Sequence, residues 1–379
     1  MSGEHLEQES RKVAVFFHAL SENAMCPDGA AAAWAIREHF KDQPGVDVEF
    51  IPLAHGDPEA TKQKILRHLD ADTETVFADI APSREVLEML MKPDENGARR
   101  AKSVTELDHH ASNDWLNDFS ASQVNGFTPP ELLLAPVSPE ESGASLAWKH
   151  YHENAPEPDI IAWVHRMDPP VALETQRDFA VAAYIDSFPM RTPAEAFAAL
   201  DTLSKMSTEE MAELGEPLRA TDVARTNALL KDAKFAQVQL LPGTEEASVL
   251  IIEADIRTLG RQGAEMLREA GEELSIPRGI AMAAHERDDG SVYLSIKTDD
   301  ALHAGHIAEH LGRTHGFGGG GHATDGAAQF GQGQFGNAVR IPTLEEMEIG
   351  NIPMPQMPPE GFAERVQSSR ARTAHHHHH

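Results

Sequence analysis

The sequence predicts an α/β protein with an N-terminal doubly wound parallel sheet, a helical connector and a smaller C-terminal α+β domain. A chain of 379 residues is too long for one ordinary core. Strand-like and helix-like segments alternate from Val13 to about Asp108, which is typical of a parallel sheet. A charged, helix-like stretch from Thr192 to about Phe235 separates this series from a second one. These observations favour two domains joined by helices.

The first series contains four apolar runs of the kind that form buried parallel strands. Strands are expected at Val13–Phe17, Val46–Leu53, Thr75–Ala78 and Val104–Leu107. The alanine-rich segment Ala30–Phe40 is expected to be the first helix. Asp57-Pro58 and Ser83 are expected to begin the next two, because aspartate and serine cap helix N-termini and proline suits the first helical position.

Helices are then expected to dominate. Ser138-Pro139 and Thr192-Pro193 each precede a glutamate three residues after the cap, the pattern of a capping box. In the last third, strands are expected at Ala247–Glu253, Gly279–His285 and Ser291–Lys297, and helices at Leu259–Ala270 and His303–Leu311. A glycine run, Gly316–Gly321, follows. The predicted boundaries are 12–190 for the first domain, 191–244 for the connector, 245–342 for the second domain and 343–379 for a tail ending in a tag-like histidine run.

Composition narrows the class of function. The formal net charge is −29, with the acidic residues spread along the chain, so a long duplex nucleic acid is not an expected partner. No apolar run is long enough to cross a membrane, and the N-terminus lacks the apolar core of a signal peptide. The single cysteine, Cys26, suits a reducing compartment. We therefore expect a cytoplasmic protein without membrane contact, and both a monomer and a homodimer stay open.

Polar side chains gather where the predicted strands of the first domain end. His18 follows the first strand, Asp79 the third, and Asp108-His109-His110 the fourth. A single aspartate at such a place is usually a cap or a turn residue. Parallel strands, however, bring their carboxyl ends to one edge of the sheet, where such folds place their sites. Carboxylates with imidazoles suit Mn²⁺ or Mg²⁺, and a carboxylate shared by two ions would build a two-metal site.

Three segments in order resemble the motifs of the DHH phosphoesterase superfamily: FFHA…CPDGAAAAWA, FADIAPS and TELDHHAS. That superfamily includes nanoRNA and pAp phosphatases, RecJ-like nucleases and family-II pyrophosphatases. The later segment GFGGGGHATDGAA resembles the signature of the accessory DHHA1 domain. The resemblance covers about residues 12 to 340. It implies an N-terminal DHH domain and a C-terminal DHHA1-like domain that binds substrate.

The resemblance also implies roles for single residues. His18 would bind a first metal ion, Asp28 and His109 a second, and Asp79 would bridge the two. Asp108 would orient His109, and His110 would face the phosphate. Asp168, in the segment WVHRMDPP, is the candidate for a further metal ligand, and its alternative is a simple helix-ending aspartate.

In the second domain the expected substrate contacts are one lysine, one arginine and the glycine run with the histidine after it. The residues are Lys297, Arg313, Gly319, Gly320, Gly321 and His322. Glycines let backbone N–H groups approach a phosphate closely. The alternatives to substrate binding are that Lys297 is simply solvated and that the glycine run is a flexible loop.

The first motif departs from the superfamily pattern. Relatives carry an aspartate just before the cysteine, and here that position is Met25. A thioether is a poor ligand for Mn²⁺ or Mg²⁺. The interval between His18 and Asp28 is also longer, and Glu22 or Asn23 is a candidate replacement ligand. Two metal ions are expected, with the first site in question.

The function expected from these features is metal-dependent hydrolysis of phosphoester bonds by metal-activated water. Small anionic nucleotides or short oligonucleotides are the expected substrates, as for a phosphodiesterase or nuclease. One alternative is a pyrophosphate or polyphosphate hydrolase of the same superfamily. Another is a degenerate member that binds nucleotides as a scaffold without turnover.

Overall fold

The computed structural model describes residues 10–138, 140–168, 173–275, 279–299 and 302–348. The chain divides into two compact units. The first comprises residues 1–173 and 185–210, and the second comprises residues 174–184 and 211–379. The chain passes from one unit to the other at three places, and the last of these falls in the first turn of α8 (Thr208–Lys231). The larger part of the predicted tail, from residue 349 onward, lies outside the described residues.

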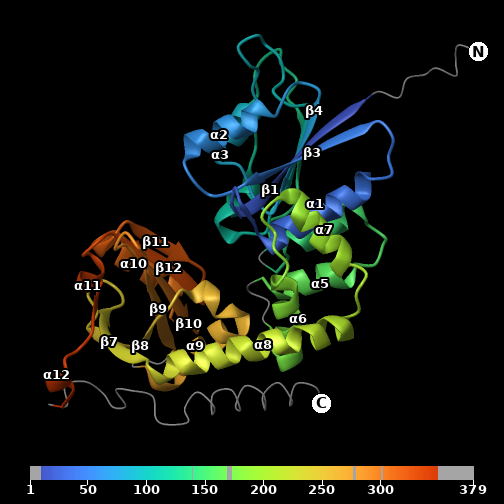
Figure 1. Ribbon diagram of the computed structural model, residues 1–379. Coiled ribbons are helices and arrows are strands. Elements are labelled where there is room, and N and C mark those ends of the chain that lie inside the picture. The colour runs from blue at the N-terminus through green and yellow to red at the C-terminus, as the bar shows by residue number, and fades with distance from the viewer. Residues whose placement is uncertain (1–9, 139, 169–172, 276–278, 300–301, 349–379) are drawn as a thin grey trace, which may run out of the picture. The chain divides into compact units, whose positions relative to one another are not determined.

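The first unit is built on a parallel sheet with the strand order β3-β1-β4-β5-β6 (Figure 1). A short strand, β2, pairs antiparallel with the end of β1. The strands are β1 (Arg11–Ser21), β2 (Ala24–Met25), β3 (Val46–Leu53), β4 (Thr73–Ala78), β5 (Ser103–Leu107) and β6 (Glu131–Leu134). The helices are α1 (Pro27–Phe40), α2 (Pro58–Arg67), α3 (Arg84–Leu90), α4 (Gly143–Tyr151), α5 (Asp159–Arg166) and α7 (Pro193–Leu203), with a 3₁₀ segment, η2 (Ala111–Asp118).

Helices cover both faces of this sheet. Ala14 and Phe16 of β1 pack on one face with side chains of α2 and α3, including Ile65 and Leu87. The alternating residues of β1 point to the opposite face, where the alanine-rich α1 lies with α4, α5 and α7 (Figure 1). The predicted doubly wound α/β fold is therefore confirmed.

The second unit holds a mixed sheet with the order β11-β12-β10-β9-β8-β7-β13, in which only β8 and β9 run parallel. The strands are β7 (Lys234–Gln239), β8 (Glu246–Glu253), β9 (Ile280–Glu286), β10 (Val292–Thr298), β11 (Gly318–Gly321), β12 (Asp325–Phe330) and β13 (Val339–Arg340). The remaining elements are α6 (Gln176–Asp186), η3 (Ile256–Thr258), α9 (Gly260–Leu274), α10 (Ala304–His315), α11 (Phe335–Ala338) and α12 (Leu344–Glu348).

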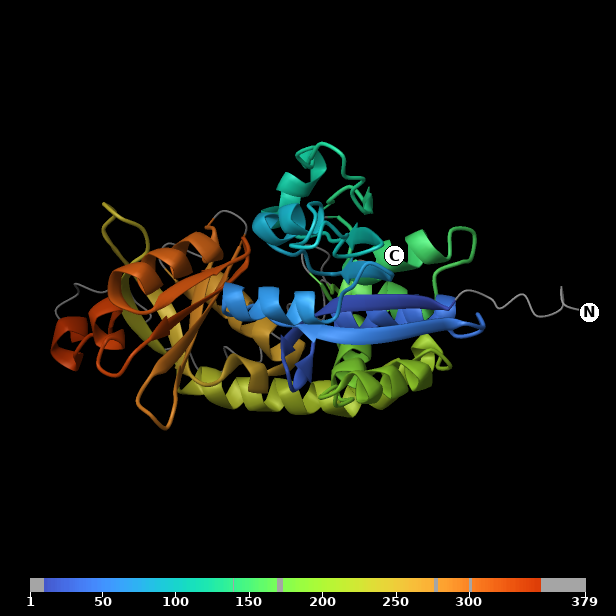
Figure 2. The same cartoon turned by 90° about the horizontal axis from the view of Figure 1, so that it is seen from above.

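Two helices cover the second sheet from opposite sides. Leu267 and Ala270 of α9 share a core with Leu250 and Ala281. Ile307 of α10 belongs to the other core, which includes Val249, Ile251 and Leu294. Figure 2 shows α10, in orange-red, lying along the strands at that end of the sheet. This packing places the glycine strand β11 directly under α10.

Most predicted elements occur with small changes in length, and one predicted helix start is wrong. Asp57, Ser83 and Thr192 cap α2, α3 and α7 as expected. The cap of α4 is Ser142 and not Ser138, because Ser142 forms a reciprocal capping box with Ser145. The expected connector helix is interrupted between α7 and α8 and gives way to β7 at Lys234. Strands β2, β6, β7, β11, β12 and β13 were not expected.

Among the described residues, no helix has the length and apolar character that a membrane span requires.

Candidate metal centre

The register of the parallel sheet places three of the predicted site residues next to one another at the carboxyl ends of the strands. Phe17 of β1 pairs with Ala78 of β4, and Ala78 pairs with Leu107 of β5. The residues that follow, His18, Asp79 and Asp108, therefore stand side by side across three neighbouring strands. The chain order reverses its direction across the sheet between β1 and β4, and doubly wound folds bind ligands at such a switch point.

The first strand is longer than expected. His18 does not end it, because β1 continues to Ser21 and turns back into β2 with a register irregularity between Ala19 and Ser21. The extra residues of the first motif form this hairpin. Glu22 and Asn23 lie exposed at its turn, and Glu22 is not among the grouped donors of the site. Met25 is buried in β2, and its backbone N–H donates to Met190 O at 2.7 Å.

Asp79 adopts a strained backbone conformation at the centre of the cluster. Its φ of 60° lies in the left-handed region, which aspartate tolerates better than most residues. Its backbone N–H donates to Leu107 O at 2.8 Å. Gly143 packs so closely that a Cβ there would lie 2.4 Å from the Asp79 Cβ. Such strain is held in place by the surrounding packing, and it is commonly found at functional sites.

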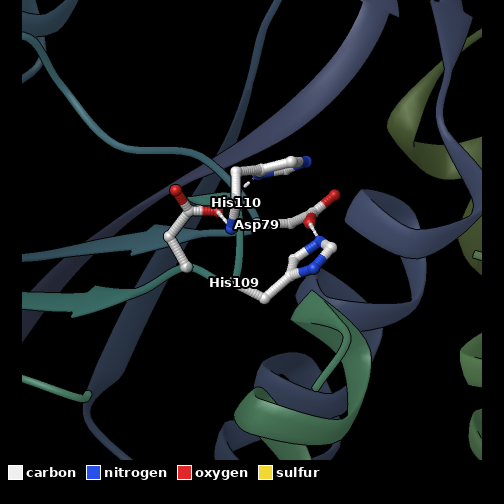
Figure 3. A group of neighbouring side chains, drawn as sticks. Asp79, His109 and His110 are labelled. Atoms are coloured by element: carbon white, nitrogen blue, oxygen red, sulfur yellow. Dashed lines mark hydrogen bonds and ion pairs between the residues drawn. The ribbon is translucent and has the colours of Figure 1, made fainter. Parts of the chain in front are cut away.

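His109 is surrounded by three carboxylates. Its Nε2 lies 2.9 Å from Asp79 Oδ1, 3.3 Å from Asp28 Oδ2 and 3.5 Å from Asp168 Oδ2. Figure 3 shows the His109 ring directed at the carboxylate of Asp79. Asp168, just after α5, is thus brought next to the other predicted ligands.

Asp28 is held by the first turn of another helix. Its two carboxylate oxygens accept hydrogen bonds from the backbone N–H groups of Gly143 and Ala144, at 3.0 and 2.9 Å. These amides begin α4, where the helix dipole favours a negative charge. The early residues of α1 and α4 are thereby joined at the site.

Asp108 was expected to orient His109, whereas its hydrogen bond in the structure is to the ring of His110. Asp108 is fully buried, and its Oδ1 lies 2.6 Å from His110 Nδ1. Its other oxygen accepts a hydrogen bond from Asn113 Nδ2 at 2.6 Å. Burial alone would lower the pKa of His110, but the hydrogen bond to Asp108 and the nearby carboxylates raise it above its usual value. His110 is therefore suited to act as a cation or hydrogen-bond donor toward an anion.

The charges of the cluster are strongly coupled. Burial, followed by the charge of Asp79, raises the pKa of Asp28 to about 7. Burial opposes the charged form of His109, but hydrogen bonds to Asp28 and Asp79 raise its pKa to about 11. Burial would also raise the pKa of Asp79, yet the hydrogen bond with His109 and the nearby ring of His18 hold it below its usual range. A protonated His109 therefore balances the carboxylates around it, and a divalent ion could replace that proton.

The donor set fits divalent metal ions. Three groups of side chains have ligand atoms within 4.8 Å of one another: Asp79 with Asp108, His109 and His110; His18 with Cys26 and Asp79; and Asp28 with His109 and Asp168. Asp79 belongs to two of these groups. Within the described chain, His18 Nδ1 is buried without a hydrogen-bond partner. Buried carboxylate and imidazole donors are the ligands that Mn²⁺, Mg²⁺ and Zn²⁺ use in proteins.

Two residues near this cluster were missed from the sequence. Cys26 belongs to the group of His18 and Asp79, and its position beside the expected aspartate was a usable signal. Burial, aided by the charges of Asp79 and Asp28, raises the pKa of its thiol. The His55 ring centroid lies 5.2 Å from that of His18. Nothing in the sequence near His55 indicated this contact, because it comes from a loop after β3.

The predicted substrate contacts of the second domain all lie in the other compact unit. Lys297 forms an ion pair with Asp325, which faces it on the neighbouring strand. Arg313 pairs with Glu309 at 2.9 Å on the surface of α10. Lys297 and Arg313, the two cations predicted to contact the substrate, are therefore each already paired with an acidic side chain.

The glycine run forms a strand and not a loop. A Cβ on Gly319 would lie 2.2 Å from Ala308 O of α10, and one on Gly305 would lie 2.3 Å from Gly321 O. The glycines thus allow two backbones to pack against each other. Within β11, Gly320 alone has both room for a Cβ, with no atom within 4 Å, and a φ outside the positive region. His322, which follows the strand, is exposed.

No protein-family model matches this chain, and no curated protein sequence matches it. Solved structures with distant similarity exist. One is an uncharacterized protein from Helicobacter pylori G27, with 11% identity over 84% of this chain and 93% of that chain, at a TM-score of 0.29. Another is a "putative family II inorganic pyrophosphatase" from Methanococcus jannaschii, with 11% identity over 76% of this chain and 88% of that chain, at a TM-score of 0.22. Similarity at this level carries no argument about activity, so the proposals below rest on the geometry of the site.

Proposed function

We propose that this chain is a divalent-metal-dependent phosphoester hydrolase that acts on small nucleotides or short oligonucleotides. The observation that carries the proposal is the position of Asp79, which belongs to two donor groups at the carboxyl edge of the sheet. A carboxylate shared in this way is the central element of two-metal phosphoryl-transfer sites.

The surrounding residues have separable tasks in this proposal. Asp28, His109 and Asp168 would hold one ion, His18 would contribute to holding the other, and Asp79 would contribute its carboxylate beside both His18 and His109. Asp108 fixes the ring of His110 through Nδ1, which leaves Nε2 as the nitrogen that can donate to a phosphate oxygen. Bound divalent ions would neutralise charge on the phosphoryl group and lower the pKa of water.

The net charge of the chain supports small substrates. At −29 the protein repels long polyanions, whereas a short substrate can be held by the bound ions and a few local donors. Nucleotides are favoured over pyrophosphate by the resemblance of the second domain.

The test is hydrolysis of a substrate panel with Mn²⁺ and, separately, after chelation. The panel contains a dinucleotide, pAp, a five-residue oligonucleotide, pyrophosphate and polyphosphate. We expect turnover of the nucleotides that needs the ion, disappears in Asp79→Asn and survives in Asp42→Asn, which alters an exposed acid outside the site.

Two results would overturn the proposal in different ways. Turnover of pyrophosphate or polyphosphate alone would establish the alternative hydrolase. Nucleotide binding without turnover of any substrate would place the chain among scaffolds.

A further inference from the structure

The chain has an unexpected sulfur donor, Cys26, next to Met25, which stands where the superfamily pattern has an aspartate. A ring nitrogen of His18, Sγ of Cys26 and a carboxylate oxygen of Asp79 all lie within 4.8 Å of one another. Ligands bound at about 2.0–2.3 Å to one ion stand roughly 3–4 Å apart. Small side-chain adjustments would therefore bring these three donors onto a single ion.

Other residues of the same segment are poorly placed for this role. Met25 occupies the position of the usual aspartate, but it is buried in β2, and its thioether is a poor ligand for hard divalent ions. Glu22 and Asn23 are exposed at the hairpin turn. Cys26 precedes the first residue of α1, and its side chain makes no capping hydrogen bond to the helix.

A second observation points to a ligand at this position. His18 Nδ1 is buried and has no hydrogen-bond partner among the described residues, although Asp79 Oδ2 is 3.5 Å away. A buried ring nitrogen without a partner is costly unless something binds it. The nitrogen, the sulfur and the carboxylate lie within 4.8 Å of one another, and structural and catalytic zinc ions use these donor types.

We propose that Cys26 is a metal ligand, and that the His18–Cys26–Asp79 position takes a thiolate-binding ion such as Zn²⁺ in preference to Mg²⁺. The inference rests on the proposed function, because it assumes that the cluster binds metal. On binding, the sulfur–metal bond forms and the thiol proton passes to the buffer. Thiolate ligands select borderline and soft ions, whereas sites built only from oxygen suit Mg²⁺.

The test is titration of the chelator-treated full chain with Co²⁺, a spectroscopic substitute for Zn²⁺. Thiolate ligation adds an intense sulfur-to-cobalt charge-transfer band in the near ultraviolet, which carboxylate and imidazole ligands lack. Cys26 is the single cysteine of the chain, so only this residue can produce the band. We expect the band to saturate at about one equivalent of the tightly bound ion.

Matched variants separate the sulfur of Cys26 from its surroundings. Cys26→Ser should abolish the charge-transfer band, keep the weaker visible bands of bound Co²⁺, and lower Zn²⁺ affinity on the order of 100-fold. Met25→Leu removes the neighbouring thioether and should leave the band unchanged. The terminal histidine run is present in every sample, so its contribution cancels in difference spectra.

The outcomes distinguish failure of this inference from failure of the proposed function. Visible Co²⁺ bands without charge transfer in the unmodified chain would overturn the role of Cys26 and leave the metal centre intact. If no Co²⁺ band can be attributed to the site, the chain has no metal centre there, and the proposed function is wrong. Because the charge-transfer band of the unmodified chain can come only from Cys26, the decision on Cys26 does not depend on the folding of a variant.

Discussion

The edge of the first sheet and the edge of the second sheet both carry conspicuous sequence motifs, but the structure explains them differently. At the first edge, Asp79 and His109 are buried polar groups brought together by strand register and backbone strain. At the second edge, the glycines of β11 are accounted for by close contact with the backbone of α10. Packing explains the glycine motif, whereas it leaves the acidic cluster unexplained.

This difference shows which features of a motif point to chemistry. Burying several like charges is costly, and a fold keeps such a group only when something compensates it. Close packing of glycines has no such cost and needs no ligand. The first edge therefore carries the functional proposal, and the second edge needs a direct test of whether it contacts substrate.

The largest expected effect is at Asp79. Asp79→Asn keeps a side chain that tolerates left-handed backbone but removes the shared negative charge. We expect kcat for the best substrate to fall by about 10³-fold or more, equivalent to about 4 kcal/mol. Steady-state kinetics at saturating Mn²⁺ measures this, with circular dichroism to verify the fold. A loss below about tenfold would mean that Asp79 does not hold the metal ions.

The next effect separates packing from binding at the second edge. Gly319→Ala places a Cβ 2.2 Å from Ala308 O, so α10 and β11 must move apart. We expect the free energy of unfolding to fall by about 1–3 kcal/mol, measured by urea denaturation.

Gly320→Ala is the matched control within the same strand. No atom lies within 4 Å of its added Cβ, so the stability should change by less than about 0.5 kcal/mol. Equal destabilisation by both variants would contradict the packing explanation. Unchanged stability with weakened substrate binding in Gly320→Ala would instead show that a ligand approaches this backbone.

Metal affinity should depend on pH through the residues around His109. The pKa of His109 is raised to about 11 and that of Asp28 to about 7, so both groups carry protons to higher pH than usual. A metal ion must displace these protons, and affinity for Mn²⁺ should therefore rise with pH. We expect an increase of up to about tenfold per pH unit for each proton released between about pH 6 and 7. Calorimetry in buffers of different ionisation enthalpy counts these protons, and a flat profile would exclude His109 and Asp28 as ligands.

The smallest expected effect concerns the helix that holds Asp28. Ser142→Ala removes the cap of α4 and should lower the free energy of unfolding by about 1 kcal/mol. Thr192→Ala removes the equivalent cap of α7, away from the cluster, at a similar cost. Only Ser142→Ala should also weaken metal binding, measured by titration. If both variants bind metal equally well, a stable first turn of α4 is not required for metal binding.

Local patterns in the sequence were sufficient for much of the fold. Strand β3 occupies the predicted range Val46–Leu53, and Asp57 and Ser83 cap helices as predicted. The gathering of Asp79 and His109 at one sheet edge was also predictable, because parallel strands share the direction of their carboxyl ends. Hydrophobic period and capping chemistry act over a few residues, so a sequence displays them directly.

Only the tertiary structure decided how these residues are used. Asp28 is held by Gly143, which is 115 residues away, and no local pattern reveals that contact. The glycine strand β11 has no side chains from which a period can be read, so its pairing with β12 and its contact with α10 were invisible. The sequence places Cys26 beside the expected aspartate, but its proximity to His18 and Asp79 is a tertiary contact. Each of these features depends on contacts between distant segments, and such contacts follow from packing of the whole unit.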